Sequence, residues 1–177
     1  MEKIPVIIDC DPGHDDMMAL VLAYGSHALD IRAVTTVAGN NTVQNTTRNA
    51  LNVLHYIGAD EVPVAMGYQD PMVRSHAQQI ENLAASRRKL RPAPKAEEGQ
   101  KVTGAAVHGK SGMDGFVFPE ENPKETEALR SVEMMAKVLR ESEQSVVIIA
   151  TAPLTNLGYL IRLYPELLPK IRRISMM

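Results

Sequence analysis

The sequence predicts an α/β fold with an open, mainly parallel sheet flanked by helices. Two observations lead to this prediction. Apolar, β-branched runs alternate with helical patterns along the chain, and those runs are continuous, as expected of strands covered on both faces. Because 177 residues is the length of one domain, we expect a single α/β domain over residues 1–177.

The first strand and helix are predicted at the start of the chain. Residues 4–9 form a β-branched run that ends in carboxylates, which indicates a buried strand. Residues 17–24 are apolar and too many for a strand, so we expect a helix there that is buried on most of its surface. Residues 29–37 are a second β-branched run, which predicts the second strand.

The next helix and strand follow directly. Residues 40–42 are two asparagines and a threonine, which offer N-caps for a helix that continues to Ile57 and ends at Gly58. Its apolar stripe repeats at helical spacing. Residues 62–66 predict a third, weaker strand.

The segment 76–107 departs from this pattern. It is basic and interrupted by prolines, so we predict a mobile loop or insertion, with a short helix near residues 78–85. Its positive charges could form a nucleic-acid patch. However, no aromatic residue lies between Tyr68 and Phe116 to stack on a base, which favours a solvated loop.

The α/β alternation returns near residue 122. Asn122-Pro-Lys-Glu125 combines an N-cap, a proline for the first helical position and a glutamate, which predicts that a helix begins there. Residues 145–150 predict a fourth strand and residues 154–163 a helix. Residues 171–177 resemble the middle of a fifth strand, so we expect the fold to be truncated after it.

Composition excludes several classes of protein. The formal net charge of −2 gives no general attraction to nucleic acid or to anionic lipid. No apolar run approaches the ~20 residues that a membrane-spanning helix needs. The single cysteine, Cys10, cannot form an internal disulfide, which suits the cytoplasm. We therefore expect a cytoplasmic protein without a nucleic-acid or membrane partner.

Four carboxylates within eight residues follow the first strand: Asp9, Asp11, Asp15 and Asp16. Ligands of open parallel sheets gather at this end of the strands, and crowded carboxylates repel one another unless a cation neutralises them. Because the candidate ligands are hard oxygens, we expect Ca²⁺ or Mg²⁺. Two of the aspartates could instead merely cap the helix. In the same loop we expect His14 to face solvent.

Two further segments are expected at the same edge of the sheet. Val37-Ala-Gly-Asn40-Asn41 ends the second strand with two amides suited to binding sugar hydroxyls, although they could also be helix caps. Residues 150–156 end the fourth strand, where a backbone carbonyl could complete the shell of a cation. Taken alone, that segment is only a strand-to-helix turn.

Together these segments resemble the inosine–uridine-preferring nucleoside hydrolases. Asp9-Cys-Asp-Pro-Gly-His-Asp-Asp16 matches the opening motif of that family in full, and Val-Ala-Gly-Asn40 is similar to its second motif. Val107-His-Gly-Lys-Ser-Gly-Met-Asp-Gly115 is similar to the third, with Met113 in place of the usual leucine. Thr151-Ala-Pro-Leu-Thr-Asn156 matches the fourth.

The resemblance implies calcium-dependent hydrolysis of the N-glycosidic bond of ribonucleosides. It implies that Asp11, Asp16 and the Thr151 carbonyl bind Ca²⁺, and that Asp11 is also the general base for the attacking water. Asp15 and Asn40 would hold ribose hydroxyls. His108 would contact or protonate the leaving base, although it could be an ordinary turn histidine.

The resemblance also implies a homo-oligomer, a dimer or tetramer, with a small-molecule ribonucleoside as its ligand. Later family segments that complete the ribose and calcium sites are not in this sequence. One alternative is therefore a catalytically incomplete fragment that keeps a nucleoside-binding or oligomerisation surface. The other is a haloacid-dehalogenase-like phosphatase, although Gly13 and the Asp15-Asp16 pair do not suit that mechanism.

Overall fold

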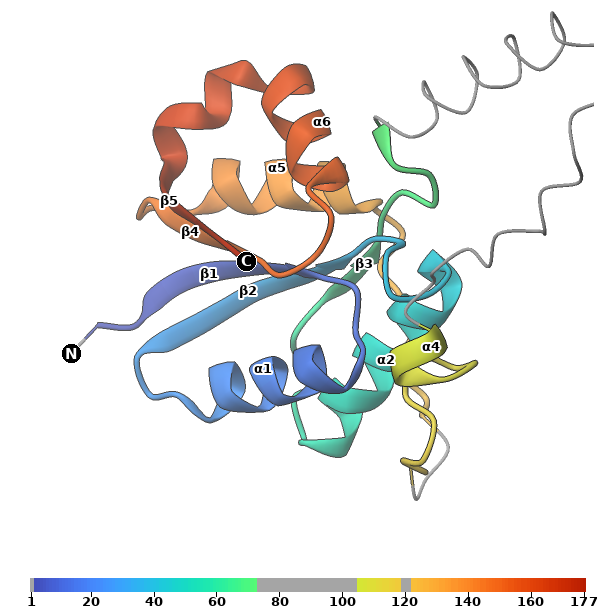
Figure 1. Ribbon diagram of the computed structural model, residues 1–177. Helices are drawn as coiled ribbons and strands as arrows, with labels where there is room; N and C mark the ends of the chain where they lie inside the picture. Colours follow the sequence, from blue (N-terminus) through green and yellow to red (C-terminus); the bar gives the residue numbers. More distant parts are fainter. Residues whose placement is uncertain (1, 73–104, 119–121) are drawn as a thin grey trace, which may run out of the picture.

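The computed structural model describes residues 2–72, 105–118 and 122–177 (Figure 1). Within these residues, five parallel strands form one sheet in the order β3-β2-β1-β4-β5. Their bounds are β1 (Ile4–Cys10), β2 (Leu29–Thr36), β3 (Val64–Met66), β4 (Val146–Ala150) and β5 (Ile171–Met176). The predicted parallel α/β fold is confirmed.

Helices cover both faces of the sheet. In the described residues they are α1 (His14–Gly25), α2 (Val43–Tyr56), α4 (Ala105–His108), α5 (Ser131–Glu141), α6 (Thr155–Leu163) and the 3₁₀ helix η1 (Pro165–Lys170). Figure 1 shows α1 and α2 on one side of the sheet and α5 and α6 on the other. Two core clusters correspond to these layers, one between α1, α2 and the sheet, the other between α5, α6 and the sheet. None of the described helices is both long and apolar enough to cross a membrane.

The chain changes direction across the sheet at β1. It runs outward from β1 through β2 to β3, and then returns to place β4 and β5 on the other side of β1. Ligands of such sheets bind beyond the carboxyl ends of the strands at this switch point. The loop that follows β1 therefore occupies the position where a ligand site is expected.

The prediction that the first helix is buried on most of its surface is wrong. Helix α1 buries Asp16, Leu20 and Ala23, which lie on one face at helical spacing, whereas Leu22 is 71% exposed and Met18 54% exposed. The sheet covers one side of the helix only, so in the described residues the apolar side chains on its other side face outward.

The prediction that a helix begins at Asn122 is also wrong. Helix α5 begins at Ser131, because the preceding residues run beside β3 and the amide of Glu127 donates to the Val64 carbonyl at 2.8 Å. Asn122 instead forms a local turn, in which its side chain accepts from the amide of Lys124 at 2.8 Å. The cap at Thr42 is confirmed, since its hydroxyl accepts from the amide of Asn45 at 3.3 Å.

The predicted loop at 76–107 and its short helix lie almost wholly outside the described residues, which resume at 105. Residues 105–107 belong to helix α4, which ends at His108 and so contains the first two residues of the third motif. Strand β5 lies at the edge of the sheet, where Met176 is 61% exposed.

Candidate active site

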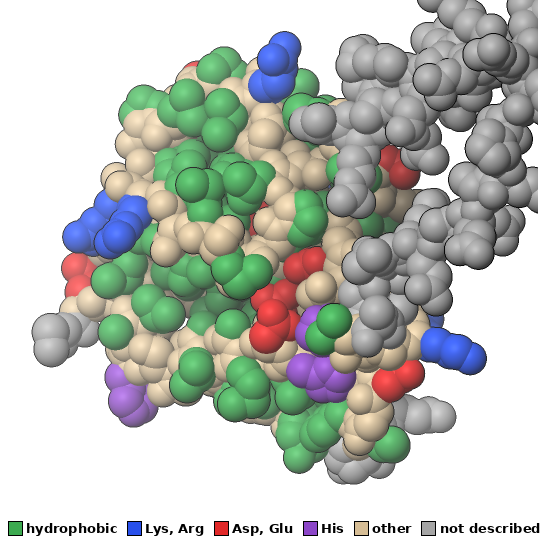
Figure 2. All heavy atoms as spheres, in the orientation of Figure 1, with side chains coloured by type: hydrophobic (Ala, Val, Ile, Leu, Met, Phe, Trp, Pro, Cys, Tyr) green, Lys and Arg blue, Asp and Glu red, His purple; other side chains and the backbone are tan. Residues whose placement is uncertain are grey.

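The loops after β1, β2 and β4 meet at one edge of the sheet. They line a pocket of about 580 Å³ whose walls include Asp11, Asp15, Asn40 and Thr151. Figure 2 shows acidic side chains gathered beside histidine side chains on this face of the molecule. Three of the four sequence motifs therefore contribute to one cavity, as predicted.

Asp11 lies at the centre of this arrangement and is 5% exposed. The amide of Asn40 donates to its Oδ2 at 2.5 Å, and the Asn40 side chain donates to its backbone carbonyl at 3.1 Å. The amide of Asp11 in turn donates to Asp16 Oδ2 at 3.1 Å. The second strand's loop and the first turn of α1 thus hold Asp11 from two sides.

Gly39 permits this close approach. A Cβ atom at that position would lie 2.0 Å from Asp11 Oδ2, so any larger residue would displace the carboxylate or the loop. Glycine is therefore needed at position 39, because a side chain there would collide with the Asp11 carboxylate.

The buried carboxylates are destabilised as anions. Burial raises the pKa of Asp11 to about 7, the amide of Asn40 opposes the rise, and the charge of Asp16 adds to it. Burial also raises the pKa of Asp16, against hydrogen bonds from the Thr151 side chain and the Asp11 amide. Helix α1 favours the charge of Asp16, because that residue lies in its first turn.

Asp9 supports the site from within the sheet and is fully buried. Its Oδ1 accepts from the Thr35 hydroxyl at 2.7 Å and from the Asn156 side chain at 2.8 Å. Burial raises its pKa to about 6, although these two hydrogen bonds lower it. Its Oδ2 has no hydrogen-bond partner among the described residues.

Thr151 joins the end of β4 to this group. Its amide and its hydroxyl both donate to the Asp9 carbonyl, at 2.9 and 3.5 Å. The structure therefore brings Asp11, Asp16 and Thr151 together at one edge of the sheet.

The donor set suits a hard divalent cation. All donors are oxygens, and no Lys or Arg in the described segments forms an ion pair with Asp11 or Asp16. A cation would offset the repulsion of two buried carboxylates. The set is small, however, since the described part of the chain holds no group of three or more Asp, Glu, His or Cys side chains placed to bind a metal.

His108 approaches the site from the third motif. Its Nε2 lies 3.7 Å from Asp15 Oδ1, and its side chain is 12% exposed. The ring packs on Gly13, where a Cβ would lie only 2.9 Å from its atoms. The structure thus places His108 of the third motif beside Asp15 of the first.

Asp114 shapes the turn that carries His108. Its carboxylate accepts from the amides of Lys110 and Ser111 at 2.8 and 2.9 Å and from the Ser111 hydroxyl at 2.6 Å, and these bonds lower its pKa to about 2. Its amide donates to the His108 carbonyl at 2.9 Å. Gly109 has φ +81°, and a Cβ there would lie 2.1 Å from Asp114.

The expectation that His14 faces solvent is only partly right. It begins α1, is only half-buried, and its Nδ1 lies 3.1 Å from Nδ1 of His108. The expectation missed this contact because 94 residues separate the two rings. Cys10, by contrast, is buried beside Thr35 as a small core residue.

Two asparagines were not recognised as site residues. The Asn49 side chain on α2 donates to the carbonyls of Pro12 and Ser111, both at 3.0 Å, and so ties the first motif to the third. Asn156 was noted only as part of a motif, yet its buried side chain holds Asp9. The available signal for Asn49 was an amide side chain next to Ala50 on the buried side of α2.

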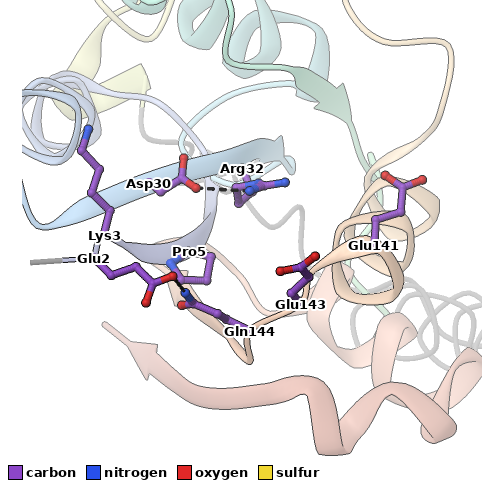
Figure 3. A pocket seen from close by; sticks show the side chains of 8 residues that line it. All are labelled: Glu2, Lys3, Pro5, Asp30, Arg32, Glu141, Glu143 and Gln144. Carbon is purple, nitrogen blue, oxygen red and sulfur yellow. Dashed lines mark hydrogen bonds and ion pairs between the residues drawn. The ribbon is translucent and has the colours of Figure 1, made fainter.

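A second hollow lies at the opposite, amino end of the strands (Figure 3). It has about 410 Å³ and is lined by side chains of both charges, including the Arg32–Asp30 pair at 3.2 Å. The motif residues do not line it. The pocket at the carboxyl ends is therefore the better candidate for the active site.

A family model described as inosine-uridine preferring nucleoside hydrolase matches residues 6–177. The pyrimidine-specific ribonucleoside hydrolase RihA of Escherichia coli O1:K1 is 40% identical over 176 residues, which cover 98% of this chain and 48% of the relative.

Solved structures of nucleoside hydrolases are also similar to this chain. An inosine-guanosine nucleoside hydrolase superposes with a TM-score of 0.76 at 26% identity, and a plant nucleoside hydrolase with 0.75 at 28%. Each match covers 99% of this chain and 48% of the other. The chain spans about half the length of the curated relatives it matches.

Proposed function

Because the chain belongs to the inosine–uridine-preferring nucleoside hydrolase family, we propose that the protein hydrolyses the N-glycosidic bond of ribonucleosides to free base and ribose. The observation that carries this proposal is the buried pair Asp11 and Asp16, held beside Asn40 and Thr151 at the switch point of the sheet. Since a 40% identical relative is named as pyrimidine-specific, uridine and cytidine are the first substrates to test.

We propose Asp11 as the general base. Its carboxylate is buried at the wall of the pocket, where it can accept a proton from a water beside it. The Asn40 amide fixes its Oδ2, so the carboxylate is held in one orientation. Asp11 would take the proton of the water that attacks the anomeric carbon.

Asp11, Asp16 and the Thr151 carbonyl are the proposed calcium ligands. A bound calcium ion would neutralise the two carboxylates and make a neighbouring water more acidic. Asp15 is exposed on the pocket wall and can accept hydrogen bonds from ribose hydroxyls, and Asn40 lines the same pocket. His108 would contact or protonate the leaving base.

A specific observation also favours the incomplete-fragment alternative. Calcium takes about 6–8 oxygen ligands, whereas only three are proposed above, and the described residues hold no group of three or more Asp, Glu, His or Cys side chains placed to bind a metal. The relatives are about twice as long as this chain. A polypeptide of 177 residues could therefore bind a nucleoside weakly without turning it over.

Release of ribose from uridine, cytidine and inosine tests the proposal, with and without added Ca²⁺ and a chelator. Calcium-dependent ribose release that Asp11→Asn abolishes would support it. Nucleoside binding without ribose release would favour the incomplete fragment. The family match argues against the phosphatase alternative, and absence of phosphate release from phosphomonoesters would agree with that.

The cytoplasmic location and the homo-oligomeric state stay predictions. Sedimentation of the purified chain would test the second. A monomer at all concentrations would contradict the expected dimer or tetramer.

A further inference from the structure

The side chain of Asn49 binds two backbone segments at once. Its Nδ2 atom donates to the carbonyl of Pro12 and to the carbonyl of Ser111, both at 3.0 Å. Carbonyl oxygens can only accept, so the nitrogen end of the amide must face both of them. The residue is 5% exposed, and the two bonds are therefore shielded from water.

The two segments meet where the His108 ring packs. Pro12 directly precedes Gly13, and Ser111 follows His108 by three residues. A Cβ atom at Gly13 would lie 2.9 Å from Cγ, Cδ2 and Cε1 of the His108 ring, so Gly13 faces the flat side of that ring. Asn49 therefore holds the backbone on both sides of the contact between the ring and Gly13.

Two more asparagines bind the same turn. Asn41, Asn45 and Asn49 are spaced four residues apart, with Asn41 just before α2 and Asn45 in its first turn, a spacing that places them on one side of the helix. Nδ2 of Asn41 donates to the Lys110 carbonyl at 3.0 Å, and Nδ2 of Asn45 donates to the same carbonyl at 3.4 Å. The amide of Thr42 donates to Oδ1 of Asn41 at 2.8 Å, which leaves the nitrogen of Asn41 toward the turn.

The turn transmits its position to His108. The Asp114 carboxylate stiffens the turn from within, as described above, and the Asp114 amide donates to the His108 carbonyl at 2.9 Å. A Cβ atom at Gly112 would lie 3.0 Å from Nδ2 of Asn49, so the turn lies directly against this side chain. A movement of the turn away from α2 would therefore carry His108 with it.

We propose that Asn49, assisted by Asn41, is a positioning residue that holds the His108 ring over Gly13. Nε2 of that ring then stays beside Asp15, at 3.7 Å from its Oδ1. For the role of His108 in the reaction, this inference rests on the proposed function. The group that meets the leaving base is then placed from α2 and not by its own turn alone.

The position of the ring can be measured without any catalysis. A proton that lies over the flat side of an aromatic ring resonates upfield, so the Hα resonances of Gly13 in ¹H–¹³C spectra of the labelled 177-residue chain report the contact. His108→Ala gives their position without the ring. We expect Asn49→Ala to move them most of the way to that position, because both bonds to the backbone are lost. Unmoved Gly13 resonances in folded Asn49→Ala would overturn the proposal.

Two further variants complete the test. Asn41→Ala removes the bond to Lys110 at a partly exposed position and should cause a smaller change in the same direction. If Asn49→Ala does not fold, Asn41→Ala decides, and unmoved Gly13 resonances there would overturn the proposal.

Asn52→Ala is the matched control. Asn52 is also on α2, but its Oδ1 accepts from the Asn122 side chain at 3.0 Å, so its loss should leave the Gly13 resonances in place. A change in Asn52→Ala as large as that in Asn49→Ala would show that any loosening of α2 moves the ring, and would overturn the proposal.

Ribose release separates this inference from the proposed function. In any form of the protein that releases ribose, Asn49→Ala should lower kcat/KM by no more than His108→Ala does, and should have no further effect in the His108→Ala background. Fully additive losses would overturn the link through His108. A chain that shows the Gly13 response but releases no ribose keeps the role of Asn49 and contradicts the proposed activity. A chain that releases ribose without the Gly13 response does the opposite.

Discussion

The Asn156 side chain forms four hydrogen bonds to different parts of the fold, and replacing it by alanine tests how strongly they stabilise the protein. Its Nδ2 donates to Asp9 Oδ1 at 2.8 Å and to the Thr36 carbonyl at 2.9 Å. Its Oδ1 accepts from the Ser131 hydroxyl at 3.0 Å and the Tyr68 amide at 3.3 Å. The side chain is fully buried. It thereby joins β1, β2, the segment after β3 and the start of α5.

The expected loss of stability in Asn156→Ala follows from these four hydrogen bonds. A buried hydrogen bond contributes about 1 kcal/mol net, so Asn156→Ala should lower the free energy of unfolding by about 4 kcal/mol. Oδ1 of Asp9 would also lose one of its two hydrogen-bond partners. Oδ2 of Asp9 has no hydrogen-bond partner among the described residues, so the carboxylate would keep only the bond from Thr35. Because a small domain is stable by only about 5–15 kcal/mol, the loss is a large fraction of the total.

Urea denaturation followed by circular dichroism measures this loss. With a slope of about 2 kcal/mol per molar urea, the midpoint should fall by about 2 M. Gln44→Ala is the control, since Gln44 is exposed on α2 and makes one contact of 3.4 Å, so its change should stay within about 0.5 kcal/mol. An Asn156→Ala midpoint as high as that of the control would refute the reasoning.

Three further predictions concern the site. In any form of the protein that releases ribose, Asp11→Asn should lower kcat by at least about 10²-fold, because the general base is lost; near-normal turnover would remove Asp11 from that role. Asn49→Ala should speed amide hydrogen exchange in residues 109–115, because it removes the two bonds from α2 to Pro12 and Ser111; unchanged exchange would contradict that link. Since the folded pKa of Asp114 is about 2, below its ordinary 3.8, its stabilising effect should be complete above about pH 4 and disappear as the pH falls through 2. Ser111→Ala should move the pKa of Asp114, followed by carboxyl NMR, back toward 3.8, and an unmoved pKa would show that other groups set it.

Much of the fold could be predicted because its signals are local. A continuous β-branched run such as residues 4–9 indicates a strand buried on both faces, whatever its neighbours are. The position of Asp11 just after that run places its carboxylate at the carboxyl edge of a parallel sheet. Strong local signals can still mislead, as at Asn122, where a hydrogen bond from Glu127 to β3 keeps the segment extended.

The tertiary structure decided which distant residues meet. The order of the strands places the loops after β1, β2 and β4 around one pocket, and no local pattern specifies that order. The contact between His14 and His108 and the four bonds of Asn156 join segments that are 25 to 147 residues apart. The raised pKa of Asp11 depends in the same way on burial and on neighbours from other loops.

The physical reason is the range of the interactions involved. Hydrophobic periodicity and helix caps act over a few residues, so the sequence alone determined the five strands, most of the helices, the parallel α/β class and the edge that carries the carboxylates. Hydrogen bonds and desolvation act between groups only after packing has brought them within a few ångströms. The partner of His108, the support of Asp9 and the ionisation of Asp11 were therefore decided by the folded arrangement.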